Sequence, residues 1–315
     1  MKQFLFLFLF IPSLAVAQKI DHLASFRDLN GDSYFRFNYD NDFFAATDKD
    51  YTQGYNLELV APVLKNNPLN FFLLDPKATV SKYGLSIEHI GFTPEQYQRP
   101  EIQFGDRPFA AAILLKSFLV ATDTAKKTRT TSSLSLGIIG PGAFGREMQT
   151  GIHRLIDDKE PLGWQHQIEN DVVLNYRLGY EKRVWSYNHL FSLQAHANAQ
   201  LGTLFTHVSA GISSTVGLID SPFTGDKKGF RLYLYAQPTL KLVGYDATLQ
   251  SGLFNRNSAY TISAAAVERL TAQFHFGLVL KTRTLYFEYT RSLITREFET
   301  GHASAWGGVN IGFTF

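Results

Sequence analysis

The stretch DVVLNYRLGYEK, residues 171–182, alternates apolar and polar side chains over most of its length. One face carries Val172, Leu174, Tyr176, Leu178 and Tyr180, and the opposite face carries Asn175, Arg177 and Glu181. A period of two predicts a β-strand, because successive strand side chains point to opposite sides. Charged residues opposite an aliphatic and aromatic face are typical of a strand between lipid and a polar barrel interior. Residues 34–39 and 285–290 repeat the pattern.

Strands of this kind recur along the chain. We predict twelve, near residues 33–40, 53–62, 81–91, 109–121, 128–139, 170–184, 188–201, 203–217, 229–243, 263–281, 284–295 and 304–315. The stretch 263–281 is long enough for two strands, which leaves the count open by two. An even count is typical of bacterial outer-membrane barrels. The predicted fold is therefore all-β, a transmembrane antiparallel β-barrel of about 12 strands.

The last eleven residues, AWGGVNIGFTF at 305–315, continue the alternation to the final phenylalanine. Val309, Ile311, Phe313 and Phe315 share one face. An ending of this kind resembles the C-terminal signal of Gram-negative outer-membrane barrels. In a soluble protein it would leave an open sheet edge. A soluble β-sandwich that ends on its last strand is the alternative.

Residues 1–17 have the features of a secretory signal peptide. Lys2 supplies the positive charge, residues 4–12 the apolar core, and Ala15, Val16 and Ala17 the small-residue cleavage site. The alternative is an N-terminal membrane anchor, but the apolar run is short for a bilayer. We expect cleavage after Ala17, which leaves residues 18–315 as the outer-membrane barrel.

The composition excludes several classes of protein. The 315 residues contain no cysteine, which excludes disulfide scaffolds and thiol enzymes. A mean hydropathy of −0.10 is too low for a bundle of membrane helices. A net charge of +2 gives no support to nucleic-acid binding. The expected partners are outer-membrane lipids, and we expect a monomer.

Strand parity predicts which connections share a side. If Phe315 is periplasmic and the strand count is even, the N-terminus is periplasmic too. The extracellular connections are then 40–52, 92–108, 140–169, 202, 244–262 and 296–303. The periplasmic connections are 63–80, 122–127, 185–187, 218–228 and 282–283. The connection 63–80 is long for a periplasmic turn.

The first two outer loops carry charged and polar side chains. The first contains oxygen ligands of the kind that calcium prefers, namely Asp40, Asn41, Asp42, Asp48 and Asp50. Their spacing does not match an EF-hand, and an ordinary solvated acidic turn is the alternative. In the second loop, Asp106 and Arg107 could pair with each other or hold a phosphate.

The third outer loop contains a predicted helix at 144–157. An apolar stripe is formed by Met148, Ile152, Leu155 and Ile156, and Gln149 and His153 lie four residues apart beside it. Pro161 ends the helical pattern. The helix could be a plug or lid, and its histidine could be purely structural.

Five ordered motifs in these loops resemble one family. They are FNYDNDFF at 37–44, DYTQG at 50–54, GDRPF at 105–109, GIIGP at 137–141 continued by EMQTGIHRLI at 147–156, and PLGWQHQIEN at 161–170. Together they look like the outer-membrane lipid A 3′-O-deacylase (LpxR) family. The motifs fall within residues 35–170, in matching order.

The resemblance implies a calcium-dependent hydrolase that removes the 3′-acyloxyacyl group of lipid A, within lipopolysaccharide, in the outer leaflet. It places active-site loops at 40–54, 92–109 and 140–170. Carried over by motif, the catalytic residues are Asn41, Thr52 and His153, with Glu160 as the acidic partner and Asp157, Asp158 or Lys159 as other alignments of that position. Asp42 would contribute to the calcium site, and Arg99 and Arg107 are the candidates for binding lipid phosphates.

The chemistry of the residues agrees with this expectation. Ester hydrolysis needs a base for water, which a histidine supplies near neutral pH, and an electrophile for the developing oxyanion, which a calcium ion held partly by Asp42 would supply. A non-enzymatic porin or adhesin with a helical plug is the first alternative. A phospholipase barrel is the second, although the outer loops hold no clear Ser–His–Asn arrangement.

Overall fold

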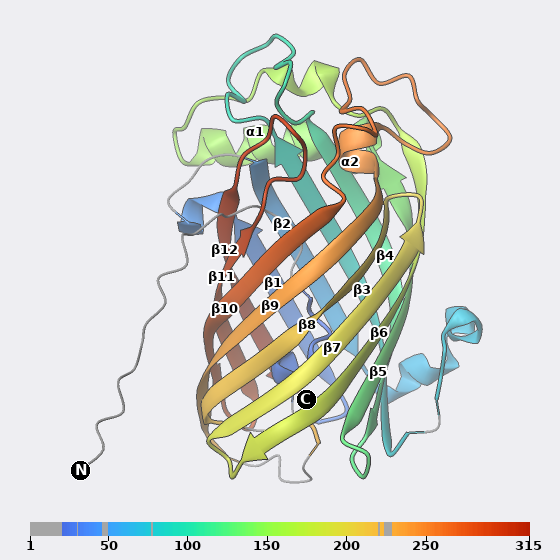
Figure 1. Cartoon of the computed structure of the whole chain (residues 1–315), viewed down its shortest axis with the longest axis vertical. Coiled ribbons are helices and arrows are strands. Elements are labelled where there is room, and N and C mark those ends of the chain that lie inside the picture. Colours follow the sequence, from blue (N-terminus) through green and yellow to red (C-terminus); the bar gives the residue numbers. More distant parts are fainter. Residues whose placement is uncertain (1–20, 30, 46–49, 77, 220, 224–228) are drawn as a thin grey trace.

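The computed structural model describes residues 21–29, 31–45, 50–76, 78–219, 221–223 and 229–315. Within them, twelve antiparallel strands form a closed barrel (Figure 1). Each strand pairs with its neighbours in the sequence, and the first pairs with the last. The predicted fold class and strand count are confirmed. The signal peptide predicted at 1–17 lies outside the described residues.

The strand bounds follow the alternating stretches of the sequence. They are β1 (Tyr34–Asn41), β2 (Asp50–Val60), β3 (Val80–Thr93), β4 (Ala110–Asp123), β5 (Thr128–Ile139), β6 (Asp171–Tyr187), β7 (Phe191–Gly202), β8 (Phe205–Leu218), β9 (Arg231–Asp246), β10 (Leu270–Lys281), β11 (Leu285–Ile294) and β12 (Ser304–Thr314). The stretch 263–281, which was long enough for two strands, contains the single strand β10. Before it, Val267 forms an isolated bridge with Phe298.

The helices lie outside the strands: η1 precedes β1, and the others lie in the connections. There are two α-helices among the described residues, α1 (Gly145–Leu155) and α2 (Ala247–Gln250). The short 3₁₀ helices are η1 (Ser25–Arg27), η2 (Asp42–Ala45), η3 (Pro62–Asn66), η4 (Pro68–Phe72), η5 (Pro141–Ala143) and η6 (Gly163–His166). No helix in the described part of the chain is both long and apolar enough to cross a membrane. The helix predicted at 144–157 is α1.

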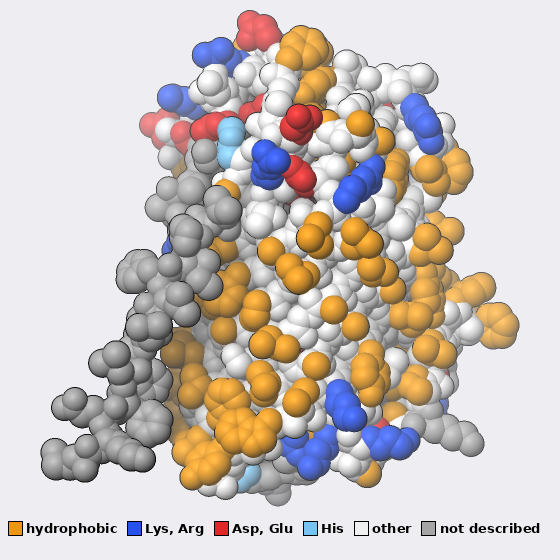
Figure 2. Space-filling view, viewed as in Figure 1, with side chains coloured by type: hydrophobic (Ala, Val, Ile, Leu, Met, Phe, Trp, Pro, Cys, Tyr) orange, Lys and Arg blue, Asp and Glu red, His pale blue; other side chains and the backbone are white. Residues whose placement is uncertain are grey.

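The C-terminal strand closes the barrel. In the seam between β1 and β12, Phe35 lies opposite Phe313 and Tyr39 opposite Val309. Apolar side chains cover the outer wall in view, and charged side chains gather toward its two ends (Figure 2). We call the end with the long connections, including α1 and α2, the loop end. The other end, where β4 turns into β5, is the turn end.

The lumen holds a segment that the sequence did not reveal. Residues 21–29 lie inside the barrel, with Phe26 and Leu29 buried. The Nε of Arg27 donates to Glu288 on β11 at 2.8 Å, and Arg36 on β1 donates to the carbonyl of Arg27 at 2.8 Å. Both side chains of the Arg27–Glu288 pair are fully buried, so each charge is stabilised by the other. The N-terminal part of the described chain therefore plugs the barrel.

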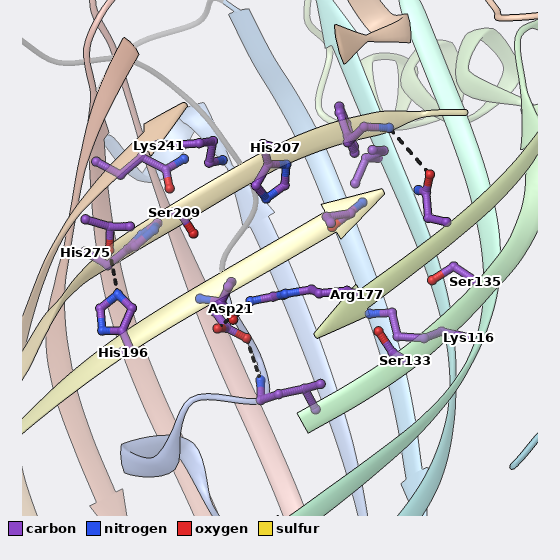
Figure 3. A pocket seen from close by; sticks show the side chains of 18 of the residues that line it. Asp21, Lys116, Ser133, Ser135, Arg177, His196, His207, Ser209, Lys241 and His275 are labelled. Carbon is purple, nitrogen blue, oxygen red and sulfur yellow. Dashed lines mark hydrogen bonds and ion pairs between the residues drawn. The ribbon is translucent and has the colours of Figure 1, made fainter. Parts of the chain in front are cut away.

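A small polar cavity of about 90 Å³ remains in the lumen (Figure 3). Its lining includes Lys116, Arg177, Lys241 and His275 from four different strands. Arg177 donates to the carboxylate of Asp21 at 2.6 Å, so the plug also forms part of the cavity wall. The interior is thus polar, as alternation predicts, and residues 21–29 fill much of it.

Candidate functional site

Asn41 and a set of polar residues on β3 lie at the loop end on the outer side of the wall. Ile87 on β3 is half exposed on the lipid-facing side, and His89 and Thr93 follow it at even spacing on that strand. On β1, Asn41 lies an even number of residues after Phe35, which is exposed on the lipid-facing side, so Asn41 faces outward as well. These polar side chains therefore point away from the lumen, on strands whose lower parts present apolar residues to lipid.

The first cluster joins the ends of β1, β2 and β3. The Nδ2 of Asn41 donates to the carbonyl of Thr52 at 2.5 Å, and the hydroxyl of Thr52 lies 2.5 Å from that of Thr93. The pairing of β2 with β3 shifts register between Asp50 and Gln53, which is the irregularity that carries Thr52. Asn41 and Thr52 are brought together as predicted. Thr93 is a third member that sequence reasoning missed.

The acidic residues of the first loop separate. Asp42 begins η2 and is only 2% exposed. Asp40 accepts a hydrogen bond from Asn38 at 3.0 Å on the inward-facing side of β1. Asp48 and the side chain of Asp50 lie outside the described residues. Among described side chains, no group of three or more His, Asp and Glu residues could hold a metal ion.

Helix α1 lies over the outer wall next to this cluster. A Cβ added to Gly145 would fall 2.4 Å from the Cβ of Ala111 on β4, so only glycine permits this approach. Just before the helix, the carbonyl of Ala143 accepts a hydrogen bond of 2.9 Å from Nε2 of His89. The outward-facing His89 therefore ties the wall to the start of the helix.

The buried face of α1 is polar. Gln149 and His153 are buried, whereas Leu155 is 86% exposed and Ile156 is also exposed. The end of the apolar stripe seen in the sequence therefore points away from the barrel. Such an arrangement is unfavourable in water, because a surface helix normally buries its apolar stripe.

His153 is held in one tautomer. Its Nδ1 lies 2.6 Å from the carbonyl oxygen of Lys159, and since a carbonyl can only accept, Nδ1 carries the proton. The Nε2 atom then keeps its lone pair. The ring of Tyr97 meets the imidazole edge to face, with centroids 5.2 Å apart. The carboxylate of Asp158 is more distant, at 3.7 Å from Nδ1.

Gln149 links the helix to an apolar cluster on the wall. Its Oε1 accepts a hydrogen bond of 2.7 Å from the indole of Trp164, which packs with Phe109 and Ala143. Its Nε2 is buried and has no hydrogen-bond partner among the described residues. Gln149 stands four residues before His153, and this helical spacing was the one sequence signal for it.

Glu160 lies in a different environment. It accepts hydrogen bonds from Arg154 at 2.6 and 3.2 Å, and both side chains are exposed to solvent. The hydrogen bond and charge of Arg154 lower the pKa of Glu160, and the hydrogen bond and charge of Glu160 raise the pKa of Arg154. The pair closes the turn that presents the Lys159 carbonyl to His153.

The two arginines predicted to bind phosphate differ in exposure. Arg107 is buried, donates to Glu297 at 3.1 Å, and its guanidinium lies 4.1 Å from the ring centroid of Phe92. Arg99 is exposed on the second loop. Arg99 is accessible to a ligand, whereas Arg107 fixes one loop against another.

The comparisons with known proteins agree with this architecture. The structure is similar to LpxR from Salmonella typhimurium, with a TM-score of 0.73 and 20% sequence identity over 90% of this chain and 100% of that one. The translocator domain of the autotransporter NalP from Neisseria meningitidis (TM-score 0.45, 11% identity, 91% and 90% covered) and the KdgM porin (0.41, 7%, 90% and 99%) are less similar. No curated protein sequence matches the chain.

The family comparison covers nearly the whole chain. Residues 4–315 match the family model described as "Outer membrane protein LpxR". This agrees with the outer-membrane location that the alternating strands and the terminal phenylalanine predict. The chain belongs to the LpxR family of outer-membrane proteins.

Proposed function

We propose that this protein is a lipid A deacylase, which hydrolyses the 3′-acyloxyacyl ester of lipid A in the outer leaflet. One observation carries the proposal. His153 is buried beneath α1 on the outer side of the wall, with Nδ1 bound to the Lys159 carbonyl and Nε2 left to act as a base. On this side of the wall, acyl chains can remain in the membrane while only the ester and headgroup enter the site.

The proposed reaction is attack of water on the ester carbonyl. The Nε2 of His153 removes a proton from the water as its oxygen bonds to the carbonyl carbon. When the tetrahedral intermediate collapses, the same proton passes to the departing sugar oxygen. The products are the free acyloxyacyl acid and a hydroxyl group at the 3′ position. The Lys159 carbonyl keeps the imidazole oriented throughout.

The other predicted residues have supporting roles in this proposal. Asn41 and Thr52, together with Thr93, supply polar groups to orient the ester. Exposed Arg99 is the proposed contact for a lipid phosphate. Arg107 would act indirectly through its contact with Glu297, by holding the second loop in place.

Calcium is part of the same proposal. Asp42 provides a buried carboxylate. Neutral oxygens come from Asn41, the residue before it, and from Thr52 on the paired strand β2. These are oxygen ligands of the kinds that calcium accepts, and waters would complete its shell of about six to eight ligands. When bound, the ion would polarise the ester carbonyl as a Lewis acid.

The decisive experiment is His153→Gln in the full-length protein. We expect the deacylation rate to fall by about 10²–10⁴, the usual contribution of a general base. Mass spectrometry of lipid A from expressing cells measures the loss of the acyloxyacyl group. Undiminished deacylation by a folded, heat-modifiable variant would contradict the mechanism.

Two further arms sharpen that experiment. His302→Gln is a matched control, because this histidine lies among the loops on the same end and pairs with Glu95, 3.1 Å away. We expect it to retain activity. Chelation of calcium should reduce the wild-type rate by about 10²–10³, the cost of losing one oxyanion contact, and added calcium should restore it. A rate insensitive to chelator would remove calcium from the proposal.

The occupied lumen weighs against the alternative of a passive pore. Residues 21–29 fill the interior and are held by buried contacts such as Arg27 with Glu288. We expect only small conductance when the protein is placed in planar bilayers. Steady porin-like conductance together with unchanged lipid A would favour the pore.

A further inference from the structure

The connection between β2 and β3 takes no part in the proposed reaction. It contains η3 and η4 and was already long for a periplasmic turn in the sequence. In Figure 1 it leaves the turn end and rises outside the lower half of the barrel, beside the wall formed by β4, β5 and β6. We call residues 61–76 the wall segment.

The wall segment is hydrogen-bonded to serines on the outer face of the barrel. Asn67 donates from Nδ2 to the Ser117 hydroxyl at 3.1 Å, and Ser117 donates to Oδ1 of Asn70 at 3.2 Å. The hydroxyl of Ser132 donates to the carbonyl of Leu74 at 3.0 Å. Ser117 lies two residues from Leu115, which is exposed on the lipid-facing side, so it faces outward as well.

These contacts lie well inside the height of the membrane. Ser117 precedes Asp123, the last residue of β4, by six positions. With about 3.3 Å of rise per residue and a strand tilt of about 40°, Ser117 stands roughly 15 Å above the turn end. The apolar band of an outer-membrane barrel is about 25 Å tall. The segment therefore reaches the hydrocarbon depth.

The outward side of the wall segment carries four large apolar side chains. The segment also exposes Lys65, Asn66 and Asp75, and of these Lys65 and Asp75 line a hollow at the turn end. Val63 is 70% exposed, Phe71 88%, Phe72 59% and Leu74 51%, while Asn67 and Asn70 turn toward the wall. A loop in water would do the opposite, because burying apolar surface is favourable and polar groups prefer solvent. Polar side chains inward and apolar side chains outward suit a surrounding of lipid.

The backbone of the segment meets the same requirement. Hydrocarbon offers no partner to a free peptide group, so each such group must be satisfied internally. The N–H groups of Leu64, Asn67, Asn70 and Leu73 donate to carbonyls three residues earlier, and that of Leu74 donates to the hydroxyl of Tyr176. Pro62 and Pro68 have no N–H to satisfy.

We propose that the wall segment is immersed among the acyl chains of phospholipids in the periplasmic leaflet, docked on the outer wall of β4–β6. The proposal rests on the predicted sidedness of the barrel and does not depend on the deacylase activity. Its apolar surface continues the lipid-facing wall, where Leu115 and Leu136 are exposed on neighbouring strands. Phospholipid acyl chains are therefore the occupant that the chemistry of both surfaces favours.

The absence of cysteine makes a spin-label test direct. Phe71→Cys, labelled with a nitroxide, is reconstituted as the full chain in dioleoylphosphatidylcholine vesicles. Collision with oxygen reports lipid, and collision with a water-soluble nickel chelate reports solvent. Leu115→Cys on the exposed wall and Lys126→Cys in the turn between β4 and β5 are the matched controls. We expect the label at residue 71 to show the oxygen-to-nickel ratio of the Leu115 control.

Two results would overturn the proposal. A ratio like that of the Lys126 control would place the segment in water. Low accessibility to both reagents would mean that protein, such as a second copy of this chain, covers it. If Phe71→Cys does not give a heat-modifiable barrel, Val63→Cys provides the same measurement from the neighbouring 3₁₀ helix.

Discussion

Two segments outside the barrel pack in the same inverted manner but differ in what their polar groups do. The wall segment turns Asn67 and Asn70 toward the barrel, where both meet Ser117. Helix α1 turns Gln149 and His153 inward, yet Gln149 Nε2 has no hydrogen-bond partner among the described residues. Satisfied polar groups anchor the first segment. The open Nε2 of Gln149 beneath α1 is the group that, in the proposed function, is available to hydrogen-bond a substrate.

Both segments turn polar side chains inward and apolar ones outward, so this packing alone does not indicate chemistry. What distinguishes α1 from the wall segment is a buried polar atom, Gln149 Nε2, that has no hydrogen-bond partner among the described residues. Such an atom costs stability, because its desolvation is not repaid by a hydrogen bond. This cost is tolerable where a substrate ester can supply the missing contact.

Among changes that test this comparison, the largest expected effect comes from moving α1 away from the wall. Gly145→Ala would introduce a Cβ 2.4 Å from the Cβ of Ala111. The helix must shift, and since a displacement of about 1 Å at a reacting group can cost about 10²-fold, we expect at least a tenfold loss of deacylation. Lipid A mass spectrometry over a time course measures the rate.

Gly151→Ala is the matched control on the same helix. Its added Cβ would meet no atom within 4 Å. The change replaces a poor helix former by a good one, so activity should be kept. Equal rates for the two variants would show that the close approach of α1 does not matter.

A smaller effect is expected when the wall segment loses its anchor. Ser117→Ala leaves the side chains of Asn67 and Asn70 without their shared partner. We expect the free energy of unfolding in urea to fall by about 1–3 kcal/mol, with deacylation unchanged. Ser86→Ala on β3 should cost less, since the Ser86 hydroxyl is buried with no hydrogen-bond partner among the described residues. A loss of activity in Ser117→Ala at full stability would contradict the division of roles.

The smallest expected effect concerns Glu160. Because Arg154 lowers its pKa, the carboxylate is charged at neutral pH, and the pair is lost only as the pH falls through that lowered pKa. Exposed ion pairs contribute little, so Glu160→Gln should slow deacylation by less than about fivefold, and by less still in high salt. Deacylation rates of the wild type and of Glu160→Gln, measured over a range of pH and salt concentration, test this expectation. A hundredfold loss would instead make Glu160 a direct participant, and Asp158→Asn tests the neighbouring acid.

Much of the fold could be predicted because alternation is a local property. The stretch 171–182 and its counterparts predict strands without knowledge of their partners, and the order of pairing follows from closure. The segment at 21–29 could not be found in this way. It has no regular period, and its partner Glu288 lies 261 positions from Arg27 in the chain.

The candidate site was predictable only in part. The motif residues Asn41 and Thr52 meet as expected. Thr93 lies at the end of β3, and the side to which it points depends on the register of that strand. Nothing in the sequence indicates that Arg107 pairs with Glu297. The inward face of α1 was ambiguous as well, because an apolar stripe indicates the core in water but can face lipid at a membrane.

The plug has a consequence for assembly. Arg27 reaches Glu288 on β11, and β12 then closes the ring against β1. A buried guanidinium without its carboxylate is strongly unfavourable, so the earliest described residues acquire their partner only when the last strands have been made. The plug therefore gains its buried ion pair only in a chain that has been made through β11, which couples the packing of residues 21–29 to the completion of the barrel.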